Sequence, residues 1–369
     1  MPETFLHGVE VIEIDTGPRP IRTVKSSVIG LVGTAPEADA DAFPLNTPVL
    51  IAGSHKEAAA LGATGTLAPA IDGILDQIGA MVVVIRVEEG EDEAGTLANV
   101  TGGVDTETGD YEGVHAFLAA QSVLGVTPRL LVAPGFTHQR PEDTENPGTC
   151  LANPVVAELL GIAERLRAVI IADGPNTNDT DAVTYRKDWG SDRVYVVDPA
   201  VLVFENETST TRPASPRIAG LIAKMDNSKG FWWSPSNQTI NGIIGTRRPV
   251  DFTLGDPDSR ANYLNENEVA TIIREDGYRL WGNRTASSDP KWAFLSVRRT
   301  ADMINDSLLR AHLWAVDRNI TRTYLEDVAE GVNAYLRSLI SQGAILGGTC
   351  WADPDLNTPA NISAGKVFF

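Results

Sequence analysis

Three short runs in the middle of the chain are apolar at successive positions, with no polar alternation. They are RLLVAPG (129–135), AVIIADG (168–174) and RVYVVDP (193–199), and each ends in small residues, glycine or proline. Such runs are typical of strands buried on both faces, and helical segments such as 153–167 lie between them. The pattern predicts an α/β region in which helices cover both faces of a parallel sheet.

The part before this region has its own pattern. Residues 24–35, 48–53 and 81–87 read as strands, and 66–79 as a helix. Ser54 and Glu57 have the spacing of a capping box, which predicts a short helix after Ser54. The segment from residue 88 to 113 is acidic, rich in glycine and threonine and without periodicity, so we expect a loop there.

The last third reads as mostly helical, with helices over 301–318 and 323–342. Gly343 is expected as the C′ residue of the second helix, where a left-handed backbone is common. The apolar face of this helix comprises Leu325, Val328, Val332, Tyr335, Leu336 and Leu339. The fold class expected for the chain as a whole is α/β and α+β, in several domains.

Both ends of the chain look extended. In residues 1–24 the apolar residues alternate roughly with acids, and Gly17-Pro18-Arg19-Pro20 then interrupts any regular structure. The chain ends in a short strand-like run. The apolar residues of the two ends are Val9, Val11, Ile12 and Ile14, and Val367, Phe368 and Phe369. A polar arm of this kind buries little surface against its own domain, so it is either disordered or paired with another element.

Charge and composition exclude several classes of function. The net charge of −19 disfavours nucleic acid and anionic membrane as main partners. Residues 1–150 hold 7 Lys+Arg against 22 Asp+Glu, a net −15, and the remainder holds 23 against 27, a net −4. No export signal or apolar run of spanning length is recognisable. The two cysteines, Cys150 and Cys350, make no disulfide framework.

The candidates for catalysis are few. Asp173 and Asp198 follow predicted strands, where ligands of open α/β sheets bind, but Asp before Gly or Pro more often makes a turn. His115 and His138 lack a partner nucleophile in any known motif, and there is no G-x-S-x-G. Asp251, Asp256 and Asp258 do not have EF-hand spacing. No phosphate loop or zinc motif is present, so we expect no enzyme, metal or cofactor.

One stretch is rich in side chains that serve either chemistry or contact. Residues 278–304 contain two tryptophans and four arginines. Those singled out are Trp281, Arg284, Trp292, Arg298 and Arg299. They fit an anion site, a subunit interface, or packing and ion pairs inside one domain.

Several separated motifs resemble one family. GFWWSPSN (230–237) with INGI (240–243), LWGNRT (280–285) with VRRT (297–300), and the opening GVEVIEID (8–15) with RPIRTVKSSVIGLVGTAP (19–36) are similar to elements of contractile tail sheath proteins, as is the approach to AGKVFF (364–369). The resemblance extends over essentially the whole chain and preserves the order of the motifs. It is closest to the short sheaths of myovirus-type phages and phage-tail-like bacteriocins.

The resemblance implies a domain plan. Residues 1–24 would be an N-terminal linking arm, 25–100 a β-rich domain, 101–270 a subtilisin-like α/β domain without protease activity, and 271–363 an α+β domain. Residues 364–369 would start a C-terminal arm that continues further in the family. The two arms would add strands to sheets of neighbouring subunits.

The resemblance also implies a function without a cofactor. Subunits would stack as hexameric rings around a tail tube protein, in contact with baseplate and tail terminator proteins, and contract to drive the tube through an envelope. Such a sheath is a virion component assembled in the host cytoplasm. The alternatives are the sheath of a bacteriocin or other injection device, a subtilisin-like hydrolase, and a monomeric binding module.

Overall fold

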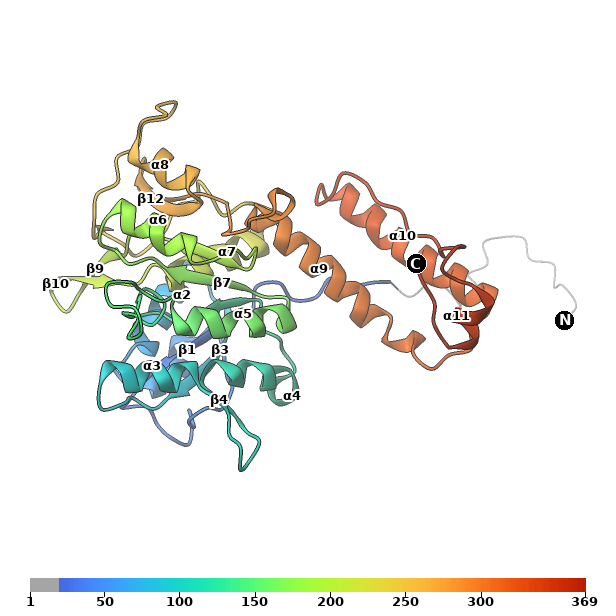
Figure 1. Ribbon diagram of the computed structural model, residues 1–369, viewed down its shortest axis with the longest axis horizontal. Coiled ribbons are helices and arrows are strands. Elements are labelled where there is room, and N and C mark those ends of the chain that lie inside the picture. Colours follow the sequence, from blue (N-terminus) through green and yellow to red (C-terminus); the bar gives the residue numbers. More distant parts are fainter. Residues whose placement is uncertain (1–19) are drawn as a thin grey trace, which may run out of the picture. The chain divides into compact units, whose positions relative to one another are not determined.

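The computed structural model describes residues 20–369, and these divide into two compact units (Figure 1). We call residues 25–303 the sheet unit, and residues 20–24 together with 304–369 the helical unit. The expected boundaries near residues 100 and 270 do not separate compact units, because strands from before, between and after them share one sheet. No helix in the described part of the chain is long and apolar enough to cross a membrane.

The sheet unit is built around eight strands in the order β13-β12-β8-β7-β6-β1-β3-β2. The six inner strands run parallel, and β2 and β13 pair antiparallel at the two edges. The strands are β1 (Ile29–Thr34), β2 (Val49–Ala52), β3 (Met81–Val87), β6 (Leu130–Val132), β7 (Val169–Asp173), β8 (Val194–Val197), β12 (Val269–Arg274) and β13 (Tyr278–Trp281). The parallel sheet predicted from the three apolar runs is therefore present, as β6, β7 and β8.

Helices cover both faces of this sheet, and successive residues of a strand enter opposite cores. Ile29 and Leu31 of β1 pack with α2 (Leu67–Leu75) and α7 (Ser215–Ser228) on one face. Val32 packs on the other face with the 3₁₀ helix η2 (Gly113–Ala119) and with α3, α5 and α6. These three helices are α3 (Glu93–Thr101), α5 (Pro154–Leu166) and α6 (Asp179–Lys187). Burial on both faces explains why these strands lack polar alternation.

Smaller elements complete the sheet unit. Three strands form a second sheet, β10-β9-β11, and two form a ribbon. They are β9 (Val201–Glu205), β10 (Thr208–Arg212), β11 (Gly245–Thr246), β4 (Gly103–Val104) and β5 (Tyr111–Glu112). The short helices are α1 (His55–Ala58), η1 (Ala59–Leu61), α4 (Ala120–Leu124), α8 (Arg260–Glu266) and η3 (Pro290–Trp292).

The loop expected over residues 88–113 was a wrong prediction. Helix α3 forms there because Asp92 caps it, accepting a hydrogen bond from the Gly95 amide at 2.7 Å, and because Thr96 and Val100 are buried. The ribbon of β4 and β5 follows. At α1, Ser54 accepts from the Lys56 amide as an N-cap, but Glu57 accepts from the Ala52 amide instead of closing the capping box.

The helical unit contains the end of α9 (Leu295–Ala311), then η4 (Leu313–Ala315), α10 (Arg322–Ser341) and α11 (Pro359–Ser363). Helix α10 agrees with its predicted bounds within one residue at either end, and Val328, Val332, Tyr335 and Leu339 are its buried residues. Gly343 has a φ of 75°, its amide donates to the Ile340 carbonyl, and the Ala344 amide donates to the Leu339 carbonyl. This is a Schellman ending, as the position of the glycine predicts.

Candidate functional site

Two arginines of the 278–304 stretch, Arg298 and Arg299, lie in buried ion pairs within the sheet unit. Arg299 is 3% exposed and donates both terminal nitrogens to Asp226 of α7 at 2.7 and 2.5 Å. Asp302, which is 1% exposed, accepts from Arg298 at 2.8 Å and from Arg193 at 2.8 Å. We call Arg193, Arg298, Arg299, Asp226 and Asp302 the α9 ion network. It attaches the first half of α9 to α7 and to the segment before β8.

The other three residues singled out in this stretch are less buried: Trp281 and Trp292 are half-buried, and Arg284 is exposed. Trp281, on β13, stacks edge-on against Phe252 with ring centroids 4.8 Å apart. The guanidinium of Arg298 lies 4.1 Å from the centre of the Trp292 ring, and that of Arg284 lies 5.3 Å from the Phe294 ring. All these contacts lie within the sheet unit. A role for the same side chains in contact between subunits remains a prediction.

Asp173, the first catalytic candidate, caps a helix. Its carboxylate accepts from the Ala214 and Ser215 amides at 2.8 Å each and from the Ser215 hydroxyl at 2.5 Å, at the start of α7. Burial raises the pKa of Asp173, while the Ser215 hydrogen bonds oppose that rise. Ser215 is fully buried and bonds to the acid directly, with no histidine between them. This geometry differs from that of a hydrolytic triad.

Asp198 and His115 are also engaged in structural contacts. Asp198 is fully buried, accepts from the Asn176 amide at 2.8 Å, and pairs with Arg248, which also pairs with Asp179. Burial raises the pKa of Asp198 in spite of the nearby Arg248 charge. His115 lies 2.8 Å from Glu158. Within residues 20–369, no group of three or more His, Cys, Asp or Glu side chains is placed to hold a metal ion.

The two predicted linking arms differ in what the structure describes. Val9, Val11, Ile12 and Ile14 lie outside the described residues. Val367, Phe368 and Phe369 form no strand, and the main chain of Phe368 bonds instead to the Asn357 side chain and accepts from the Asp353 amide. Strand formation by the chain end needs a partner strand, and no segment of the described chain pairs with it.

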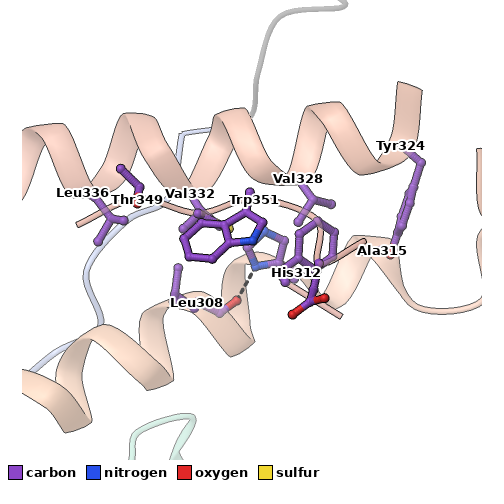
Figure 2. Close-up of a pocket in the computed structure, with 12 residues that line it drawn as sticks. Leu308, His312, Ala315, Tyr324, Val328, Val332, Leu336, Thr349 and Trp351 are labelled. Atoms are coloured by element: carbon purple, nitrogen blue, oxygen red, sulfur yellow. Dashed lines mark hydrogen bonds between the residues drawn. The ribbon is translucent and has the colours of Figure 1, made fainter. Parts of the chain in front are cut away.

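An apolar groove of about 520 Å³ opens in the helical unit (Figure 2). Leu308 of α9 and His312, directly after α9, face Val328, Val332 and Leu336 of α10 across it. Trp351 lies between the two helices. His312 Nδ1 lies 2.6 Å from the Leu308 carbonyl oxygen. The other lining residues are Ala315, Tyr324, Thr349, Cys350, Asp353 and Phe369.

The beginning of the described chain lies on the same two helices. The Thr23 hydroxyl is 3.0 Å from the Tyr335 hydroxyl of α10, and the Val24 amide donates to the Ser307 hydroxyl of α9 at 3.0 Å.

The helical unit also has exposed apolar side chains, among them Leu309, Leu313, Val316, Leu346 and Trp351. Apolar exposure of this extent is typical of a surface that another chain covers.

Comparisons with known proteins decide the family. Models of the tail sheath protein Gp18 domain III N-terminal region, the phage tail sheath protein central domain and the phage tail sheath C-terminal domain match residues 26–87, 109–286 and 287–369. A putative prophage major tail sheath protein of Pseudomonas aeruginosa (strain UCBPP-PA14) is 45% identical over 99% of this chain and 92% of its own length. The chain belongs to the phage tail sheath protein family.

Other relatives agree with the resemblance seen in the sequence motifs. The tail sheath protein of Escherichia phage P2 is 40% identical over 99% of the chain and 90% of its own length. The contracted helical sheath of the anti-feeding prophage has a TM-score of 0.71 at 20% identity, covering 99% of this chain and 94% of that one. The contracted sheath of the PVC extracellular contractile injection system has a TM-score of 0.70 at 16% identity. That match covers 100% of this chain and 93% of the PVC chain. These structures confirm the mixed α/β fold of a sheath subunit.

Proposed function

We propose that this chain is the building subunit of a contractile tail sheath. Copies assemble as stacked hexameric rings around a tail tube, between baseplate and terminator proteins, and contract to drive the tube through a cell envelope. The observation that carries the proposal is identity of 45% and 40%, over almost the whole chain, to proteins named as tail sheath proteins. The work is mechanical, through rearranged subunit contacts, and needs no catalytic residue or cofactor.

The helical unit supports a specific way of linking copies. Residues 5–14 contain Phe5, Val9, Val11 and Ile14 among polar residues, and a groove of 520 Å³ offers apolar walls of matching character. We assign this groove to the N-terminal segment of a second copy. Main-chain and apolar contacts through a linking arm tolerate large rotations between subunits. The final residues, Val367 to Phe369, join the same linkage when a partner strand is available.

Negative-stain electron microscopy of the purified chain tests the proposal. Striated tubes or stacked rings are expected for the full chain. A chain lacking residues 1–20 should stay folded by circular dichroism and sediment as a subunit that does not polymerise. Tubes formed by the shortened chain would overturn the arm linkage, and uniform small particles from the full chain, even with purified tube protein added, would overturn self-assembly.

A second candidate within the same class has a specific observation in its favour. The similar solved sheaths come from the anti-feeding prophage and from an extracellular contractile injection system. The chain would then be the sheath of an injection device. Capsid genes beside the gene of this chain would favour a phage sheath. The absence of capsid genes would favour the sheath of an injection device.

A further inference from the structure

The start of the described chain and the apolar groove share the same two helices. Val24 donates its amide to Ser307 on α9, and the Thr23 hydroxyl bonds to that of Tyr335 on α10, both at 3.0 Å. Ser307 and Tyr335 each directly precede a leucine that lines the groove (Figure 2). The N-terminal segment of a subunit therefore begins next to the walls of the groove in that same subunit.

One wall of this groove is held in place by an amide side chain. Asn333 of α10 donates to the Cys350 carbonyl and accepts from the Cys350 amide, both at 2.8 Å. These bonds hold the segment with Cys350 and Trp351 along α10, and both residues line the groove. Trp351 is 60% exposed, so a preformed apolar surface faces solvent in a subunit without a partner. This surface needs a cover before assembly as well as after it.

The N-terminal segment is long enough to return to the groove of its own subunit. Gly17-Pro18-Arg19-Pro20 separates the anchored residues from the apolar residues that end at Ile14, and such a sequence is typical of a turn. Nine residue steps lead from Ile14 to Thr23, and they span up to about 30 Å when extended. The groove lies along α10 from Tyr324 to Leu336, about 18 Å of helix. The segment can therefore reach the whole groove.

We propose, on the basis of the sheath function proposed above, that residues 5–14 fill the groove of their own subunit until assembly begins. A short tether gives a segment an effective concentration on the order of millimolar at a nearby site, so at micromolar subunit its own segment outcompetes that of another copy. In a growing ring the segment exchanges into the groove of a neighbour. Exchange of an identical element between copies conserves its contacts and costs little. Self-closure therefore keeps free subunits apart.

Disulfide trapping of the full chain tests self-closure, because Cys350 already lines the groove. Val9→Cys and Val11→Cys are each combined with Cys150→Ser, which removes the other, exposed cysteine. Free subunits are oxidised with glutathione disulfide. Unlabelled and isotope-labelled chains are mixed, so that mass spectrometry distinguishes disulfides within a chain from those between chains. At about 10 µM subunit, linkage to Cys350 within a chain should exceed linkage between chains on the order of a hundredfold in at least one variant.

Glu10→Cys, also combined with Cys150→Ser, is the matched control. Successive side chains of an extended segment point to opposite sides, so Glu10 faces away from a groove that Val9 and Val11 face. The control should therefore lose most of the linkage within a chain. Equal linkage in all three variants, linkage mainly between chains, or no linkage in either valine variant would overturn self-closure.

The linked subunit tests the exchange step. The valine variant that forms the disulfide should give no tubes in negative-stain electron microscopy, and dithiothreitol should restore tubes to the level of the Glu10→Cys chain. Tubes formed by the linked chain would overturn the exchange. If wild type and the reduced chains also form no tubes, the proposed sheath function fails. Linkage within a chain is measured on free subunits and decides self-closure in either case.

Discussion

Asp302 joins two arginines of the α9 ion network, since it accepts hydrogen bonds from both Arg193 and Arg298. The sequence pointed to Arg298 and Arg299 but not to their acidic partners. Asp226 is 73 residues from Arg299, and Asp302 is 109 residues from Arg193. No local pattern connects the residues of these two pairs. Arg298 and Asp302, by contrast, are four residues apart on α9, a spacing from which the sequence could have predicted their pairing.

Asp302→Asn should lower the free energy of unfolding by about 3–5 kcal/mol, because two buried guanidinium groups then lose their shared anion. Glu326→Gln is the matched control. Glu326 pairs with Arg322 at the surface, and its loss should cost under about 1 kcal/mol. Urea unfolding of both variants measures the difference, and equal losses would contradict a special role for the network.

Asp173 should make stability depend on pH. Its pKa is raised by burial, so on raising the pH the unfolded chain releases this proton before the folded chain does. The folded state then binds more protons, and stability falls as pH rises from the unfolded value near 3.8 through the folded pKa.

Asp173→Asn removes this proton. The stability of the Asn variant relative to wild type should therefore increase as pH rises through that window. Unfolding of both proteins in urea at several pH values between about 4 and 7 measures it. If the difference in the free energy of unfolding between the two proteins stayed constant over this pH range, the raised pKa of Asp173 would be contradicted.

Secondary structure was predictable wherever burial produced a clear pattern. The runs that became β3, β6, β7 and β8 are apolar at nearly every position, and α10 is apolar on one helical face. Helix α3 was missed because only Thr96 and Val100 of it are buried, too few to produce a period. Strands β12 and β13 were missed as well, since they join the sheet through long-range pairing with β8. The motifs predicted the family but not these pairings.

The end of α10 provides a test at this scale. Gly343→Ala should cost roughly 1 kcal/mol, because φ is 75° there and no neighbouring atom within 4 Å limits the added methyl group. Gly347→Ala is the control, since Gly347 has no positive φ and equally open surroundings. Thermal unfolding compares the two, and an equal effect would show that the Schellman ending does not determine the cost.

The charge of the whole subunit opposes its own assembly. Each copy has a net charge of −19, so copies repel one another as they pack, and salt screens that repulsion. The fraction of polymer at fixed protein concentration should therefore rise between about 20 and about 200 mM sodium chloride. Analytical sedimentation measures it, and a fraction that falls with salt would indicate that attraction between opposite charges governs the contacts.

The burial of the α9 ion network also has a consequence for heat resistance. The cost of removing charged groups from water decreases as temperature rises, whereas the apolar contribution per unit area levels off. The attachment of α9 to α7 through Arg299 and Asp226 therefore gains in relative weight on warming. Near the melting temperature, this helix should be among the last elements of the sheet unit to exchange its amide hydrogens with solvent.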